Sequence, residues 1–94
     1  AYAEMETGTT ALSFVCETLV NDFLPFRPNR LNEQPAGIEI SLVTEEVHHR
    51  YDIAIKAGAA PVMQPIQKPW GQIVSYVKDN NGSLVEICSP INPA

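Results

Sequence analysis

The sequence predicts an α+β protein, and three features of its second half lead to this prediction. Residues 37–43 form a short apolar run of the kind found in strands. Apolar side chains then recur at helical spacing from Val47 until Gly58. Three further strand-like runs follow, the last two joined by a turn at residues 78–82. The order β-α-β-β-β predicts an open, curved sheet with one helix behind it.

The helix has recognisable signals at both ends. Thr44 is the expected N-cap, and Glu45 and Glu46 suit the positive end of the helix dipole. Gly58 is the expected stop, because glycine readily adopts the left-handed conformation that ends many helices. The side chains expected to face the sheet are Val47, Tyr51, Ala54 and Ile55.

The three later strands differ in how freely they can pair. Residues 61–65 contain Pro61 and Pro65, so this strand must lie at a sheet edge or end at Pro65. Residues 71–77 and 83–88 flank a turn containing Asn81-Gly82, which is typical of a hairpin.

The first 36 residues predict a hairpin followed by a linker. Residues 2–6 and 10–16 are rich in strand-forming side chains, and Gly8 between them can take a positive φ. Residues 18–36 hold Pro25, Pro28 and Pro35, so they predict an irregular linker. We therefore expect a single domain with a hairpin at 1–17, a linker at 18–36 and a complete unit at 37–91.

Composition narrows the possible partners and compartment. The 94 residues carry a formal net charge of −5, which disfavours nucleic acid and anionic membranes as partners. No apolar run is long enough to span a bilayer. The N-terminus does not resemble a signal peptide. The chain begins without Met, so the sequence leaves open whether the natural protein has a segment before Ala1. Cys16 and Cys88 lie in apolar strand contexts, and we interpret them as reduced core residues of a cytoplasmic protein.

Several segments of the second half together resemble the C-terminal module of the vicinal oxygen chelate superfamily. This superfamily includes glyoxalase I, extradiol dioxygenases and the bleomycin- and fosfomycin-resistance proteins. The matching segments are Glu45-Glu46-Val47, Ala57-Gly58-Ala59, Pro69-Trp70-Gly71 and Lys78-Asp79-Asn80-Asn81-Gly82-Ser83-Leu84-Val85-Glu86-Ile87. They cover a little over half of the chain. The resemblance implies a βαβββ module of the glyoxalase/bleomycin-resistance type.

The family builds its site from two such modules, and here the first one looks incomplete. Residues 2–17 resemble only the last hairpin of a first module. The resemblance therefore implies either a longer protein or a homodimer in which two chains complete each other, with possible module exchange. A third reading is a fragment whose half-cavity has no function.

Two glutamates occupy positions at which relatives hold a divalent metal. Glu39 matches the first-strand ligand and Glu86 the last-strand ligand. The two-residue period of a strand turns Glu39 away from Ile38 and Ile40, and Glu86 away from its own apolar neighbours. If metal is bound, the resemblance implies one ion of Mn, Fe, Ni, Co or Zn acting as a Lewis acid.

The first-module half supplies no clear ligand to match them. Residues 11–16 contain no carboxylate or imidazole, and Glu17 could serve only with an altered register. His48 and His49 lie at the start of the helix, on the outside of such a module. The sequence therefore favours a small-molecule-binding protein without metal. The alternative is a metal-dependent lyase, isomerase or dioxygenase with Glu39 and Glu86 as ligands.

A metal-free relative would bind its ligand by apolar and aromatic contact. The residues expected near the cavity are Trp70, Tyr76, Phe14, Met63 and Gln64. An equally good reading of Trp70 is that it only anchors the turn before the third strand. The sequence assigns no catalytic residue: it has no Gly-rich phosphate loop and no nucleophile elbow, and Cys16 lacks a histidine partner.

Overall fold

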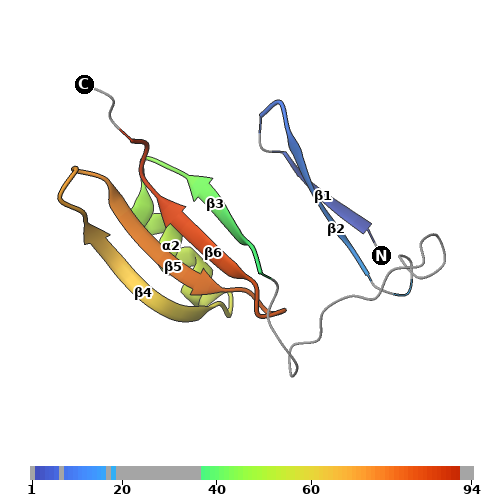
Figure 1. Cartoon of the computed structure of the whole chain (residues 1–94). Coiled ribbons are helices and arrows are strands. Elements are labelled where there is room, and N and C mark those ends of the chain that lie inside the picture. Colours follow the sequence, from blue (N-terminus) through green and yellow to red (C-terminus); the bar gives the residue numbers. More distant parts are fainter. Residues whose placement is uncertain (1, 7, 17, 19–36, 92–94) are drawn as a thin grey trace.

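The structure, a computed structural model, describes residues 2–6, 8–16, 18 and 37–91. These residues form a two-stranded hairpin and a separate four-stranded sheet with one helix packed behind it (Figure 1). The predicted α+β class and the β-α-β-β-β order of residues 37–91 are confirmed.

The four-stranded sheet has the strand order β3-β6-β5-β4. Its strands are β3 (Glu39–Val43), β4 (Ala60–Gln67), β5 (Ile73–Lys78) and β6 (Leu84–Cys88). β3 runs parallel to β6, whereas β5 is antiparallel to both β6 and β4. The first and last strands of the unit therefore lie side by side, and this brings Glu39 and Glu86 onto neighbouring strands.

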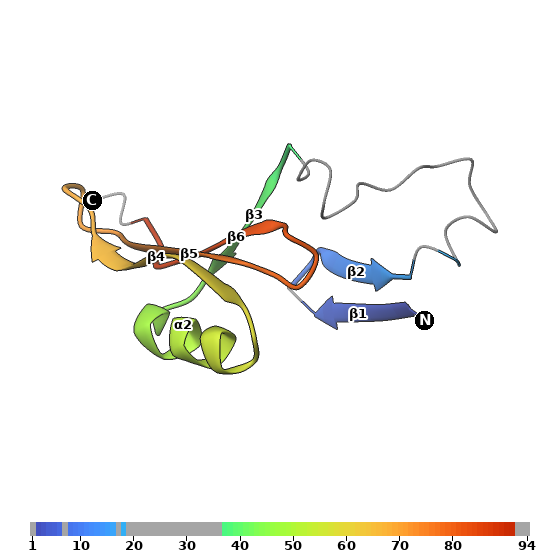
Figure 2. The same cartoon turned by 90° about the horizontal axis from the view of Figure 1, so that it is seen from below.

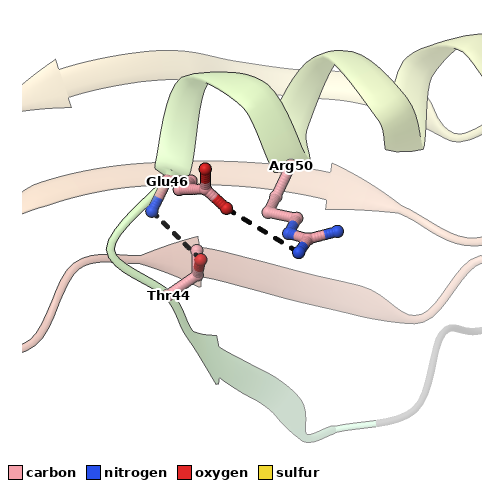
Figure 3. Close-up of polar contacts among 3 residues, drawn as sticks. All are labelled: Thr44, Glu46 and Arg50. Carbon is pink, nitrogen blue, oxygen red and sulfur yellow. Dashed lines mark hydrogen bonds and ion pairs between the residues drawn. The ribbon is translucent and has the colours of Figure 1, made fainter.

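Helix α2 (Val47–Lys56) begins later than the sequence predicts. Glu46, not Thr44, holds the N-cap position, and both Glu45 and Glu46 precede the helix. The reason is local: the Thr44 hydroxyl accepts a hydrogen bond from the Glu46 amide at 3.1 Å, which closes a turn before the first helical residue (Figure 3). The Glu46 carboxylate then forms an ion pair with Arg50 at 3.7 Å, one turn into the helix.

The core lies between α2 and the sheet. Val47 and Tyr51 are buried against Val77 and Ile87. Ala54 and Ile55 pack at the border of this cluster, so the predicted helix face is confirmed. Gly58 ends the helix with φ = 109°, a conformation that favours glycine.

Strand β4 lies at the sheet edge, as its prolines require. It nevertheless continues through Pro65 to Gln67, beyond the expected end. The pairing with β5 shifts register between Pro61 and Met63 and again between Met63 and Ile66. The second shift spans Pro65, which cannot donate to the ladder, so the strand continues past Pro65 with an irregular pairing.

The hairpin consists of β1 (Tyr2–Glu6) and β2 (Ala11–Val15), with Gly8 at φ = 98° in the turn. The predicted linker lies outside the described residues except for Thr18. Cys88 is buried as predicted, whereas Cys16 is only half-buried; both side chains are thiols. Of the described helices, none is long and apolar enough to cross a membrane.

Candidate functional site

The two faces of the four-stranded sheet have different roles. Seen from below, α2 covers one face, and no helix of the described residues covers the other (Figure 2). Val77, Val85 and Ile87 point toward α2 and pack in the core. Their neighbours along the strands point the opposite way, because side chains alternate in a strand. We call this uncovered side the open face.

Three side chains that lie across the middle of the open face form a hydrogen-bonded group. In the strand register, Ser41 pairs with Glu86, and Glu86 pairs with Tyr76. Ser41 Oγ donates to Glu86 Oε1 at 2.7 Å, and Tyr76 Oη donates to Glu86 Oε2 at 3.1 Å. We call Ser41, Glu86 and Tyr76 the central row. It links three adjacent strands through one carboxylate.

The rows on either side of the central row differ in chemistry. Val43, Cys88 and Val74 pair across the same three strands and form an apolar row, of which Val43 is exposed and Cys88 and Val74 are buried. On the other side, Leu84 lies between Glu39 and Lys78 and separates their opposite charges. The open face therefore combines an exposed apolar residue at the β3 edge, a central polar row and a charged border.

The central carboxylate affects the ionisation of its neighbours. Burial, followed by the hydrogen bond and the negative charge of Glu86, raises the pKa of Tyr76 above its ordinary value. Burial and then Glu86 likewise raise the pKa of the Cys88 thiol. Glu39 contributes to both shifts through its charge. Tyr76 therefore stays protonated and acts as a donor at neutral pH.

Four of the sequence-predicted residues lie in or beside the central row. Glu86 occupies its centre, and Tyr76 one end. Glu39 lies two residues before Ser41 on the same face of β3, as the period predicts, although Ile38 precedes the strand and is exposed. Met63 pairs with Tyr76 in the register and continues the row into β4.

The other expected ligand-binding residues lie elsewhere. Gln64 is exposed in the irregular part of β4, and Phe14 is 48% exposed on the hairpin strand β2. Trp70 is 60% exposed in the turn before β5. Its Nε1 donates to Gln72 Oε1 at 2.9 Å, and the Gln72 amide donates to the Ser89 carbonyl. These two hydrogen bonds fix the turn before β5, which agrees with the reading of Trp70 as an anchor of that turn.

Trp70 and the central row are separated along β5. Its partner Gln72 precedes Tyr76 by four residues, which corresponds to about 13 Å at the rise of an extended strand. The structure therefore brings Tyr76, Glu86 and Glu39 to one region but not Trp70.

Ser41 is a residue of the central row that the sequence does not predict. A signal was present, because Ser41 is two residues from Glu39 and therefore on the same face of the strand. What the sequence lacks is the register that sets Ser41 opposite Glu86.

The described residues alone do not fit a divalent metal centre. They contain no group of three or more histidine, cysteine, aspartate or glutamate side chains close enough to hold an ion. Glu39 and Glu86 supply two carboxylates, whereas oxygen-ligated divalent ions usually take six or more ligands. His48 and His49 are exposed on α2, on the opposite side of the sheet, and Glu17 lies outside the described residues.

The structure has two hollows beside the helix side of the sheet. One of about 880 Å³ lies at the edge of β3, where Leu42, Ile53 and Ala54 line it from the helix side and Ser41 and Val43 also border it. One of about 450 Å³ lies beside the end of α2. Both are lined mainly by side chains of the helix side. We place the candidate site on the open face because the charged and hydrogen-bonding groups gather there.

Comparison with solved structures identifies the fold. A glyoxalase-related enzyme from Fulvimarina pelagi superposes with a TM-score of 0.74 at 18% identity, over 95% of this chain and 64% of that chain. A glyoxalase/bleomycin resistance protein/dioxygenase from Nocardioides gives 0.61 at 15% identity, over 99% and 64%. A member of the same superfamily from Sphaerobacter thermophilus gives 0.52 at 24% identity, over 61% and 47%.

The chain thus spans slightly less than two thirds of the length of the Fulvimarina structure. Neither a protein-family model nor a curated protein sequence matches it. At these identities the likeness establishes the fold. The chain has the fold of the vicinal oxygen chelate superfamily, to which glyoxalases, bleomycin-resistance proteins and related dioxygenases belong.

Proposed function

We propose that the protein binds a small molecule on the open face of its four-stranded sheet, without a metal ion of its own. The observation that carries this proposal is the central row, in which one carboxylate is fixed by two hydroxyls on an uncovered sheet face. Such a constellation offers a few oriented polar groups beside apolar surface, which is the usual composition of a ligand site.

The metal-dependent alternative requires ligands from outside the described residues. Glu39 and Glu86 would be two of them, and the remainder would have to come from another part of the assembled protein. Each oxygen of Glu86 already accepts one hydrogen bond, which leaves lone pairs for a ligand on both oxygens. The shortage of further ligands among the described residues is what favours the metal-free function.

The assembled site extends beyond one chain in this proposal. β3 is the edge strand nearest the central row, and no described strand pairs with its outer side. A homodimer that joins two copies near this edge, with or without module exchange, would supply the second wall of the cavity. The relatives are about half as long again as the chain, which agrees with a second wall being needed.

A fragment screen by NMR tests the proposal. Amide resonances of ¹⁵N-labelled protein are followed while small neutral and charged fragments are added. We expect shifts to cluster on Ser41, Tyr76 and Glu86, and to disappear in Glu86→Ala. Ser41 also lines the 880 Å³ hollow, so Tyr76 and Glu86 are the deciding reporters. Shifts that cluster on Arg50, Ile53 and Ala54 of α2 and leave Tyr76 and Glu86 unmoved would move the binding site to the helix side and contradict the proposal.

A further inference from the structure

The hydrogen-bond directions in the central row restrict what it can bind. A carboxylate has no proton to donate, so Ser41 and Tyr76 must both be the donors in their bonds to Glu86. Each hydroxyl has one proton, and both protons are spent within the row. The capacity that remains on Ser41 Oγ, Tyr76 Oη and the two Glu86 oxygens consists of lone pairs. Toward a ligand, the central row is composed of acceptors alone.

The charges around the central row also favour a ligand that is a hydrogen-bond donor and carries positive charge. Glu39 adds a second carboxylate on the same face, one row away from Ser41. Lys78 is a basic residue of this part of the face, two strands from Glu39 but on the strand next to Glu86, diagonal to it in the register at roughly 7–8 Å. It offsets part of the negative charge, and the two carboxylates leave this part of the face net negative.

From these observations, and resting on the function proposed above, we propose that the central row selects a protonated primary amine that carries an apolar body. An ammonium group has three N–H donors and no acceptor, which matches a row of acceptors around one negative charge. Val43 borders the central row next to Ser41 and is 64% exposed, so it offers the apolar surface for the body of the ligand, whereas Cys88 and Val74 beyond it are buried. The two carboxylates outnumber Lys78 on this part of the face, so anions are disfavoured.

Three probes of the same size separate this inference from binding in general. The cation is 2-phenylethylamine, its neutral counterpart is 2-phenylethanol, and the anion is phenylacetate. Each is titrated at pH 7 into the full chain, and the amide shifts of the central row are followed. We expect the amine to bind at least about tenfold more tightly than the alcohol, the ratio that one charge-assisted hydrogen bond supplies. Phenylacetate should produce no shift in the row.

Two variants then separate charge from hydrogen-bond direction. Glu86→Gln keeps the shape of the side chain but removes its charge. The new amide NH₂ donates a hydrogen bond to either the Ser41 or the Tyr76 hydroxyl, and that hydroxyl then points its own proton outward. We expect the preference for the amine to disappear. Tyr76→Phe keeps the charge and removes one acceptor, so the amine should bind a few-fold more weakly but remain preferred. Glu45→Gln, an exposed glutamate before α2, is the matched control and should behave like the wild type.

Each outcome decides the inference. A preference for the amine that is lost in Glu86→Gln supports it. Equal or tighter binding of the alcohol or of phenylacetate on the open face overturns it but leaves the proposed small-molecule function standing. The absence of any amine binding also overturns it, and the fragment screen then decides the proposed function separately. Dispersed amide spectra of every variant exclude loss of the fold as the cause.

Discussion

At the scale of single residues, Glu86 is the group on which the open face is organised. Its two oxygens each accept a bond from a different neighbouring strand, so one side chain holds β3, β6 and β5 in register on this face. The same carboxylate influences the ionisation of Tyr76 and Cys88. Glu86 therefore has a part in both the stability and the binding chemistry of the sheet.

Removing the carboxylate should destabilise the fold more than removing one of its partners. Because hydrogen bonds to charged groups contribute more than neutral ones, we expect Glu86→Ala to lower the free energy of unfolding by roughly 1–3 kcal/mol. Ser41→Ala should cost about 0.5–1.5 kcal/mol. Urea denaturation measures both, with Glu45→Ala as the exposed control. Equal stability of Glu86→Ala and the control would show that the two hydrogen bonds contribute nothing.

The raised pKa of Tyr76 predicts a loss of stability in alkali. Its ordinary value is 10.0, and the folded protein holds it higher, so folding favours the protonated phenol. The resulting stability is complete below pH 10 and is lost as the pH rises toward the folded pKa. Urea denaturation between pH 8 and 11.5 should show this decline, and it should be smaller in Tyr76→Phe. An identical decline in the variant would assign it to other groups, such as Cys88.

At this scale the sequence predicts orientation but not contact. The positions of Val85 and Ile87 are sufficient to turn Glu86 away from the core, as observed. They cannot show that Ser41, 45 residues earlier, would donate to it. That contact depends on the parallel register of β3 and β6, which arises from the path of the whole chain.

At the scale of elements, the helix shows which local signals decide a boundary. The sequence predicts the end at Gly58 because glycine readily takes a left-handed conformation, and the structure has φ = 109° there. The sequence places the start two residues early, because the Thr44 hydroxyl can act either as a helix cap or as the acceptor of a turn. Likewise, Pro65 is compatible with two structures, a strand that ends there or a strand at the sheet edge. Which of the two forms depends on the strands that pair with β4, and these are not visible in its local sequence.

Substitution of two glycines tests the argument about helix termination. No atom lies within 4 Å of a Cβ added at Gly58 or at Gly37, so neither change causes a clash. Of these two glycines, Gly58 alone has a positive φ, and Gly58→Ala should therefore cost roughly 1–2 kcal/mol of unfolding free energy. Gly37→Ala should be close to neutral. Thermal and urea unfolding compare the pair, and a neutral Gly58→Ala would contradict the role given to its conformation.

At the scale of the whole molecule, the exposed edge of β3 is the notable feature. The edge strand contains no lysine, proline or bulge that would prevent pairing, and Val43 is 64% exposed on it. The sequence predicts an unpaired sheet edge, because residues 2–17 resemble only the last hairpin of a first module. What the sequence could not supply was the partner of the edge, since that depends on a second surface.

We expect the chain to associate through this edge. Sedimentation velocity of the wild type should show dimers that dissociate on dilution, and Val43→Lys should shift the population toward monomers, because charge on an edge opposes strand pairing. Val62→Lys, at a half-exposed position of the opposite edge strand β4, is the matched control. Monomers at all concentrations, or equal effects of the two variants, would contradict association at β3.

Metal stoichiometry tests the central claim of a metal-free binding site most directly. The protein is stripped with chelator, offered Mn, Fe, Ni, Co and Zn in turn, dialysed, and analysed for metal per chain alongside Glu86→Gln. Because the described residues provide only two carboxylates on the open face, we predict that the folded protein retains far less than one ion per chain or per dimer, with no difference between wild type and variant. Retention of one ion per chain or per dimer that is lost in Glu86→Gln would contradict the account and establish a metal site centred on Glu86.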